Sequence, residues 1–258
     1  MFGFLKNRRR KRLLSQPFPA AWTEILEQNV ALYRRLPEED QRELRGRIQV
    51  FLAEKRFEGC GGLAITDEVR VTIAAQACVL LLHRKTDYFP GLYSIVVYPA
   101  AYLAPTVKEA GPGMVLEGEE DRLGEAWGKG PIVLSWEDVL SDAAGSEDGS
   151  NVVLHEFAHE LDNEDGALNG APRLERGQMY AEWSRVLGAA YERLKRDAEA
   201  GREGILDEYG ATDPAEFFAV ATECFFERPL DLRHEQPELY EKLKEFYRQD
   251  PVFYREPN

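Results

Sequence analysis

The feature that most constrains the fold of this chain is a helix-patterned segment with two histidines four residues apart. The segment, residues 152–162, reads Val-Val-Leu-His-Glu-Phe-Ala-His-Glu-Leu-Asp. A spacing of four residues places His155 and His159 on one face of an α-helix, close enough to share an ion. The opposite face is apolar, so the fold has to bury it. A loop rich in Gly, Ala and Ser, residues 143–150, precedes the segment.

This segment has the His-Glu-x-x-His pattern of a metal site. Neutral imidazole is a good zinc ligand, and Glu156 follows the first histidine, where it can act as general base on a water that the metal activates. The bare pattern also occurs by chance, as a pair of exposed histidines on an amphipathic helix. Two of the four histidines of the chain lie in it, and its helical context favours the metal interpretation.

A catalytic zinc site needs a third protein ligand and one open position. Asp165 would complete an extended pattern, but that pattern needs glycine where this chain has Asp162. Glu216 follows Asp213 and Pro214, which have the pattern of an N-cap and a first helical position. Its carboxylate would then stand at the start of a second helix. The same spacing is typical of a capping box, in which Glu216 bonds only the backbone, and spacing alone does not decide.

Glu223 lies seven residues after Glu216, on the same face of that predicted helix. It is either the hydrogen-bond partner of a ligand imidazole or a solvated charge. His83 and His234 lie in contexts typical of surface or packing histidines, so we do not expect them to be ligands.

The predicted elements run from helices to a few strands and back to helices. Helical spacing covers residues 20–57 in two helices, and a third helix follows the capping pattern at residues 65–67. Residues 92–98 and 130–136 have strand-like sequences, and the chain after residue 151 is mostly helical in pattern. This order predicts an α+β fold with a small mixed sheet, in one domain over residues 20–258 whose helical N-terminal part ends near residue 85.

Composition limits the partners and the compartment. The chain of 258 residues has a formal net charge of −14, which disfavours direct nucleic-acid binding. Its three cysteines form no CxxC pair, so free thiols in a reducing compartment are expected. No apolar run reaches the ~20 residues of a membrane span. These features predict a cytoplasmic protein, and the basic segment 1–19 is expected to be a disordered tail.

Two segments together resemble a known family. His155-Glu-Phe-Ala-His159-Glu-Leu-Asp162, with the downstream segment 209–220 that begins Tyr-Gly-Ala-Thr-Asp-Pro, is similar to the Mlc titration factor A family of bacterial zinc peptidases. That family is related, in its metal-site region, to the catalytic domain of anthrax lethal factor. The similarity extends to the opening residues and to segment 239–251. It implies a zincin-like fold, one Zn²⁺ per chain, and Glu216 as the third ligand beside His155 and His159.

The resemblance also implies roles and partners. It nominates Tyr209 as a hydroxyl that stabilises the oxyanion, beside Glu156 as the base, and an aminopeptidase-like activity on a peptide or protein substrate. A transcriptional repressor of the Mlc type is a second implied partner. Two rival interpretations are a regulatory protein that sequesters such a repressor with little peptidase activity, and a structural zinc site with a fourth protein ligand.

The strand pattern at residues 132–136 permits two interpretations. It is either an edge strand along which an extended peptide substrate adds, or an ordinary core strand, which we favour.

Overall fold

The structure is a computed structural model that describes residues 2–100, 102–109, 115–122, 124–126, 130–145, 149–174, 177 and 179–254. It is mostly helical and has one small mixed sheet, which is consistent with the predicted α+β class. No helix among these residues is long and apolar enough to cross a bilayer. The zincin-like fold stays a prediction.

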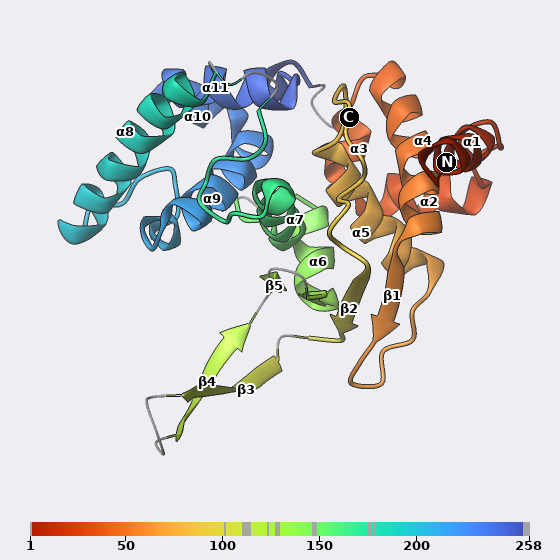
Figure 1. The fold of residues 1–258 in the computed structure, drawn as a ribbon, viewed down its shortest axis with the longest axis horizontal. Helices are drawn as coiled ribbons and strands as arrows, with labels where there is room; N and C mark the ends of the chain where they lie inside the picture. Colours follow the sequence, from red (N-terminus) through yellow and green to blue (C-terminus); the bar gives the residue numbers. More distant parts are fainter. Residues whose placement is uncertain are drawn as a thin grey trace.

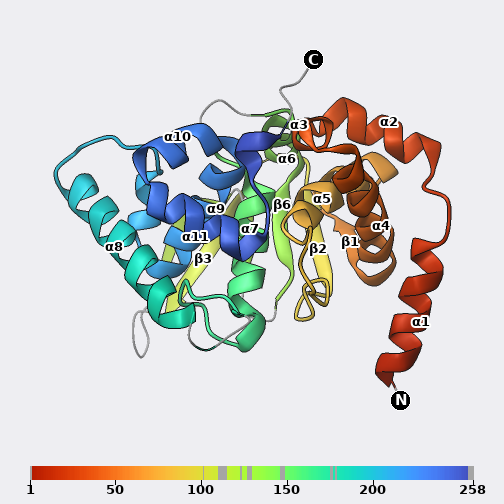
Figure 2. The same cartoon turned by 90° about the horizontal axis from the view of Figure 1, so that it is seen from above.

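Helices dominate the N-terminal part of the chain. They are α1 (Phe2–Leu14), α2 (Ala20–Asn29), α3 (Ala31–Arg35), α4 (Glu38–Glu54) and α5 (Asp67–Val79). Helix α5 begins where the sequence predicts it, because the Thr66 side chain accepts a hydrogen bond from the amide of Val69. Figures 1 and 2 show α1 at the outer edge of this part, at the opposite end of the molecule from α8 (Met179–Glu199).

The central sheet has three parallel strands and a short antiparallel fourth. In spatial order they are β1 (Arg56–Gly59), β2 (Ser94–Tyr98), β6 (Ile132–Ser135) and β5 (Gly124–Ala126). The register pairs Ile95 with Ile132 and Val97 with Leu134, and these four side chains are buried. A separate hairpin of β3 (Tyr102–Glu109) and β4 (Val115–Arg122) projects from the body in Figure 1.

The C-terminal part is again helical. Its elements are α6 (Trp136–Ala143), α7 (Val152–Asp162), η1 (Asn163–Asp165), α8, η2 (Glu208–Ala211), α9 (Pro214–Glu227), α10 (Pro229–Glu235), α11 (Pro237–Tyr247) and η3 (Pro251–Phe253). Helices α7 and α9 pack against each other at the centre of the molecule (Figure 1). The apolar face of α7 joins one continuous core with the sheet and with α5, so the patterned helix is placed between the sheet and the C-terminal helices.

The structure supports the favoured interpretation of residues 132–136 as a core strand rather than an edge strand, because β6 has β2 on one side and β5 on the other. Two other expectations need correction. Trp136 begins α6 rather than ending the strand, since the Ser135 hydroxyl caps that helix. Much of the expected disordered tail is helix α1, which is held to the body by Arg10. The Arg10 guanidinium makes two hydrogen bonds of 2.7 Å to the Glu54 carboxylate and lies 4.6 Å above the Tyr88 ring.

Candidate metal centre

Helix α7 is held rigidly at its start and along its apolar face. Asn151 caps it by accepting a hydrogen bond of 3.0 Å from the amide of Leu154. Phe157, on the face opposite the histidines, packs with ring centroids 4.8 Å from Phe89 and 5.7 Å from Phe51. Because Phe157 is fully buried, the rotation of the helix about its axis is fixed, and with it the direction of the two imidazoles.

Helix α9 supplies the third side chain. The Asp213 carboxylate accepts hydrogen bonds from the amides of Ala215 and Glu216, at 2.8 and 3.1 Å, and Pro214 is the first helical residue. The cap is thus made by Asp213, while the Glu216 carboxylate turns toward α7. The structure therefore favours the ligand interpretation of Glu216 over the capping box.

His155, His159 and Glu216 form a triangle of donor atoms. The Glu216 Oε2 atom lies 3.0 Å from His155 Nε2 and 3.3 Å from His159 Nε2, and the two Nε2 atoms are 3.2 Å apart. Ligands about 2.0–2.1 Å from a tetrahedral zinc ion are themselves about 3.3 Å apart. The three atoms thus have the spacing and the chemistry of a zinc donor set, and they form the one such cluster among the described residues.

The electrostatics of the triangle favour a cation. Burial disfavours the charged form of His155, but hydrogen bonds to Glu216 and Glu223 outweigh it and raise the pKa of the imidazole. Burial likewise opposes ionisation of Glu216, yet the two imidazoles hold its pKa well below the usual range. The acidic groups therefore stabilise positive charge at the centre of the cluster.

Glu223 lies behind His155. Its Oε1 atom is 2.6 Å from His155 Nδ1, and its Oε2 atom accepts a hydrogen bond of 2.6 Å from the amide of Asn151. With Glu223 only 7% exposed, the interpretation as a solvated charge is wrong. Because Glu223 accepts a hydrogen bond from Nδ1–H, the neutral form of His155 presents the lone pair of Nε2 to the cluster, and this is the tautomer that a metal needs.

Asn151 is the residue that the sequence interpretation missed. Its side-chain amide donates hydrogen bonds of 2.9 Å to Gln76 on α5 and to Glu227 on α9. The same side chain caps α7, so it ties three helices together behind the metal cluster. An asparagine directly before an apolar helical segment is the signal that would have identified it.

Glu156 and Tyr209, the two predicted catalytic residues, differ in exposure. Glu156 is 4% exposed and follows His155 on α7. Tyr209 is 54% exposed, in η2, with its ring centroid 6.1 Å from that of His155. Gly210 fixes η2 against α9, because a Cβ atom there would lie 3.2 Å from Val220. Both residues are thus on elements that contact α9.

Asp165 is not part of the cluster. It ends η1, and its carboxylate accepts a hydrogen bond of 3.1 Å from the amide of Ala167. Asp162, where the extended pattern would need glycine, is fully buried and accepts hydrogen bonds of 2.8 Å from the amides of Asn169 and Gly170. These acids order the loop after α7, so the candidacy of Asp165 as third ligand finds no support.

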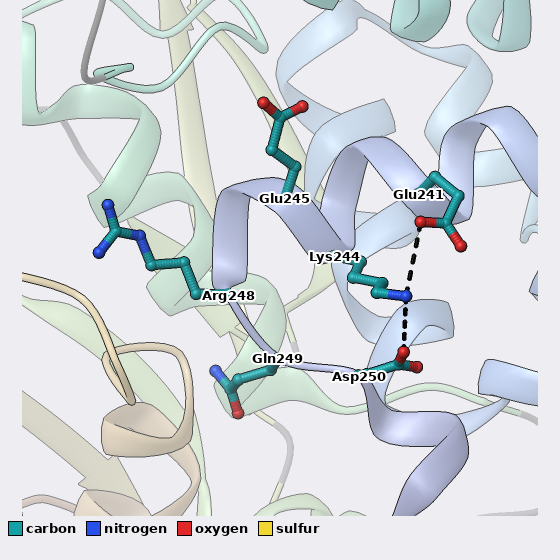
Figure 3. A pocket seen from close by; sticks show the side chains of 6 residues that line it. All are labelled: Glu241, Lys244, Glu245, Arg248, Gln249 and Asp250. Atoms are coloured by element: carbon teal, nitrogen blue, oxygen red, sulfur yellow. Dashed lines mark ion pairs between the residues drawn. The ribbon is translucent and has the colours of Figure 1, made fainter.

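A separate pocket of about 370 Å³ lies at the end of α11 (Figure 3). Its lining residues are Glu241, Lys244, Glu245, Arg248, Gln249 and Asp250. Lys244 is paired with Asp250 at 2.7 Å and with Glu241 at 3.5 Å. None of the lining residues belongs to the metal cluster, so this pocket is not part of the candidate site.

Comparison with known proteins identifies the family of this chain. The family model described as "Glucose-regulated metallo-peptidase M90" matches residues 5–248. An uncharacterized protein of Synechocystis sp. is 39% identical over 95% of this chain and 89% of its own length. Mlc titration factor A of Yersinia pestis and that of Yersinia pseudotuberculosis are each 32% identical over 90% of this chain and 86% of theirs. The family resemblance seen in the sequence is confirmed, and the chain belongs to the glucose-regulated M90 metallopeptidase family.

Proposed function

We propose that this chain is a zinc-dependent peptidase of aminopeptidase-like specificity, with one zinc ion held by His155, His159 and Glu216. The observation that carries the proposal is the triangle of donor atoms, 3.0–3.3 Å apart and contributed by two helices that the core holds together. We include in the proposal a zincin-like fold, a single domain over residues 20–258 and a cytoplasmic location.

Bound there, zinc would polarise the scissile carbonyl and lower the pKa of a water toward ~7. Glu156 takes the proton of the attacking water and then delivers it to the leaving amine. Its position supports this role, because Glu156 directly follows His155 on α7 and its carboxylate is shielded from bulk water. Tyr209 donates a hydrogen bond to the oxyanion as the carbonyl carbon becomes tetrahedral.

Glu223 has a positioning role in this proposal. The hydrogen bond that Glu223 accepts from Nδ1 fixes the ring orientation and the tautomer of His155. Glu223 is held in turn by the hydrogen bond from the backbone amide of Asn151. A rigid ligand set loses little entropy when the ion binds, so the affinity for zinc depends on this support.

The decisive experiment compares Glu156→Gln with the wild-type chain. The variant should keep one zinc per chain and lose peptidase activity by roughly 10²–10⁴-fold, because only the general base is removed. Glu192→Gln, an exposed position on α8, is the matched control and should keep full activity. A Glu156→Gln chain with the wild-type rate would exclude Glu156 as the base.

Substrate blocking tests the aminopeptidase-like specificity separately. Peptides with a free N-terminal amine should be cleaved at the first bond, whereas acetylated copies of the same peptides should resist cleavage. Equal cleavage of both sets would establish endopeptidase activity and leave the zinc chemistry intact.

Chelation and re-addition of zinc test the rival interpretation, a structural zinc site. Such a site needs four protein ligands, whereas three donors meet among the described residues. Chelation should therefore abolish activity while leaving the chain folded, and added zinc should restore the rate.

The second candidate function is binding of a repressor. Relatives at 32% identity are named Mlc titration factor A, and that name supports an interaction with an Mlc-type repressor. Glu156→Gln distinguishes the two functions, because it should retain repressor binding while it abolishes hydrolysis. Failure to bind a purified Mlc-type repressor would exclude this function alone.

A further inference from the structure

Helix α1 presents a basic and partly apolar face that neither the metal cluster nor the peptidase function uses. Residues 6–12 hold six of the 32 Lys and Arg residues of the chain, and α1 contains no acidic residue. The rest of the chain has 26 basic against 46 acidic side chains. Helix α1 is thus a cationic segment without acidic residues, at the outer edge of an otherwise acidic molecule (Figure 2).

The two faces of α1 have different partners. Lys6, Arg10 and Leu13 follow helical spacing and face the body, where Lys6 pairs with Asp87 at 2.9 Å and Arg10 with Glu54. Because these contacts hold the helix, the direction of its other face is fixed. That face is therefore an oriented surface rather than a flexible tail.

The outer face carries Phe4, Leu5, Arg8, Lys11 and Arg12, again at helical spacing. Arg8, Lys11 and Arg12 are exposed, and none is paired with an acidic side chain among the described residues. Phe4 is 73% exposed and Leu5 58%. The face therefore combines three free cations with two apolar side chains in water, at the same end of the molecule.

We propose that α1 docks the protein on the surface of an anionic lipid bilayer. Phosphate headgroups attract Arg8, Lys11 and Arg12, and Phe4 and Leu5 insert at the boundary between headgroups and acyl chains. The apolar pair favours lipid over nucleic acid, because a duplex offers a phosphate surface but no apolar layer for these side chains. With the acidic body turned away from the headgroups, docking is restricted to one orientation.

Sedimentation with vesicles tests the docking surface on the full chain. Wild type should bind vesicles of phosphatidylglycerol mixed with phosphatidylcholine at about 0.1 M NaCl and should release at about 1 M. It should not bind phosphatidylcholine alone. The triple variant Arg8→Gln, Lys11→Gln, Arg12→Gln should bind roughly 100-fold more weakly, since each charge contributes about fivefold.

The matched control is Arg56→Gln, Arg196→Gln, Arg233→Gln, which removes the same charge from exposed positions on β1, α8 and α10. It should bind vesicles like wild type. Phe4→Ala with Leu5→Ala should weaken binding by about tenfold or more without any change in charge. Peptidase activity and thermal unfolding in the absence of vesicles should be unchanged in all three variants.

Three results would overturn the proposal. One is that the wild-type chain binds anionic vesicles no better than phosphatidylcholine vesicles. Another is that the control triple variant loses as much vesicle binding as the Arg8, Lys11 and Arg12 triple variant. The third is a combination of two observations: duplex DNA binds as tightly as the vesicles, and the Phe4 and Leu5 substitutions leave vesicle binding unchanged. That combination would assign the face to nucleic acid.

Discussion

Helices α9 and α1 place charged side chains in opposite environments. In α9 the carboxylates of Glu216, Glu223 and Glu227 extend from a buried apolar helix, and each meets a partner near the start of α7 or on its histidine face. In α1 the cations of the outer face are solvated. A buried charge must be paired at a defined distance, whereas a solvated charge interacts with other charges over several ångströms without a fixed partner.

The role of a charge therefore depends on a different property in each of the two helices. In α9 it is geometry, so a single substitution should have a large effect that a second charge elsewhere cannot compensate. In α1 it is the sum of the charges, so single substitutions should have small and roughly additive effects.

The largest effect should follow removal of the third donor. Glu216→Ala should bind less than one zinc per chain and lose activity by roughly 10³-fold or more, because two imidazoles alone hold the ion weakly. Metal analysis after dialysis measures the first effect and peptide hydrolysis the second. Glu192→Ala on exposed α8 is the control, and retention of zinc by Glu216→Ala would contradict the ligand assignment.

Tyr209→Phe should come next. Loss of one donor to the oxyanion is expected to lower kcat by about 10²-fold while KM and zinc content stay close to wild type. Steady-state kinetics with a free-amine peptide provides the measurement. A kcat within a factor of two of wild type would show that Tyr209 lines the site without stabilising the oxyanion.

Glu223→Gln separates positioning from direct ligation. The variant loses the charge that orients His155, so zinc affinity should fall by about 10–100-fold, as measured by competition with a chelator. The unfolding temperature of the metal-free chain is the accompanying readout. If the zinc affinity is unchanged and only the unfolding temperature falls, the role of Glu223 is structural.

Titration of the buried Glu227 carboxyl on α9 should make the free energy of unfolding depend on pH. Burial raises its pKa to about 7, although the hydrogen bond from Asn151 opposes the shift. The folded chain therefore binds this proton more tightly than the unfolded chain does, and the free energy of unfolding should fall as pH rises through the window from 4.5 to about 7. Glu227→Gln keeps an acceptor for Asn151 and should remove that decline, which amounts to on the order of 3 kcal/mol over the window.

Denaturant unfolding at a series of pH values measures this slope. The free energy of unfolding of Glu227→Gln should diverge from that of wild type only within the window. Parallel curves for the two chains would mean that Glu227 titrates normally in the folded state.

The smallest effect should follow substitution of Arg10, which holds α1 to the body of the protein. Arg10→Gln breaks the paired hydrogen bonds to Glu54, yet α1 lies at the edge of the fold, so global stability should fall by only about 1 kcal/mol. Hydrogen exchange of the α1 amides should speed up while activity stays constant. Arg12→Gln, on the solvated face, should leave exchange unchanged.

The candidate site could be predicted because its parts are local patterns. The spacing of His155 and His159 and the cap at Asp213 are each written within a few residues, and helix geometry converts such spacing into shared faces. Glu223 could be placed on the face of Glu216 in the same way. Whether those carboxylates met a metal ligand or the solvent depended on the packing of α9 against α7, which no local pattern contains.

The fold could be predicted less completely than the site, because it depends on packing between segments that are distant in the sequence. Strands β1 and β5 are four and three residues long, too short for alternation to be visible. The pairing of β5 with β6, which makes β6 a core strand, could therefore not be read from the sequence. Helix α1 was mistaken for a disordered tail, since its anchor is an ion pair between residues 44 positions apart in the sequence.

Local sequence patterns were sufficient to place the candidate groups: two imidazoles one turn apart, a glutamate between them, and an acidic helix start downstream. Helical periodicity is a property of the backbone, so these relations hold in any fold that keeps the helices. The packing of distant segments was needed to establish which acid lies against both imidazoles, which one lies behind His155, and where the basic helix points. Those outcomes require segments dozens of residues apart to be buried together, and burial is a property of the whole chain.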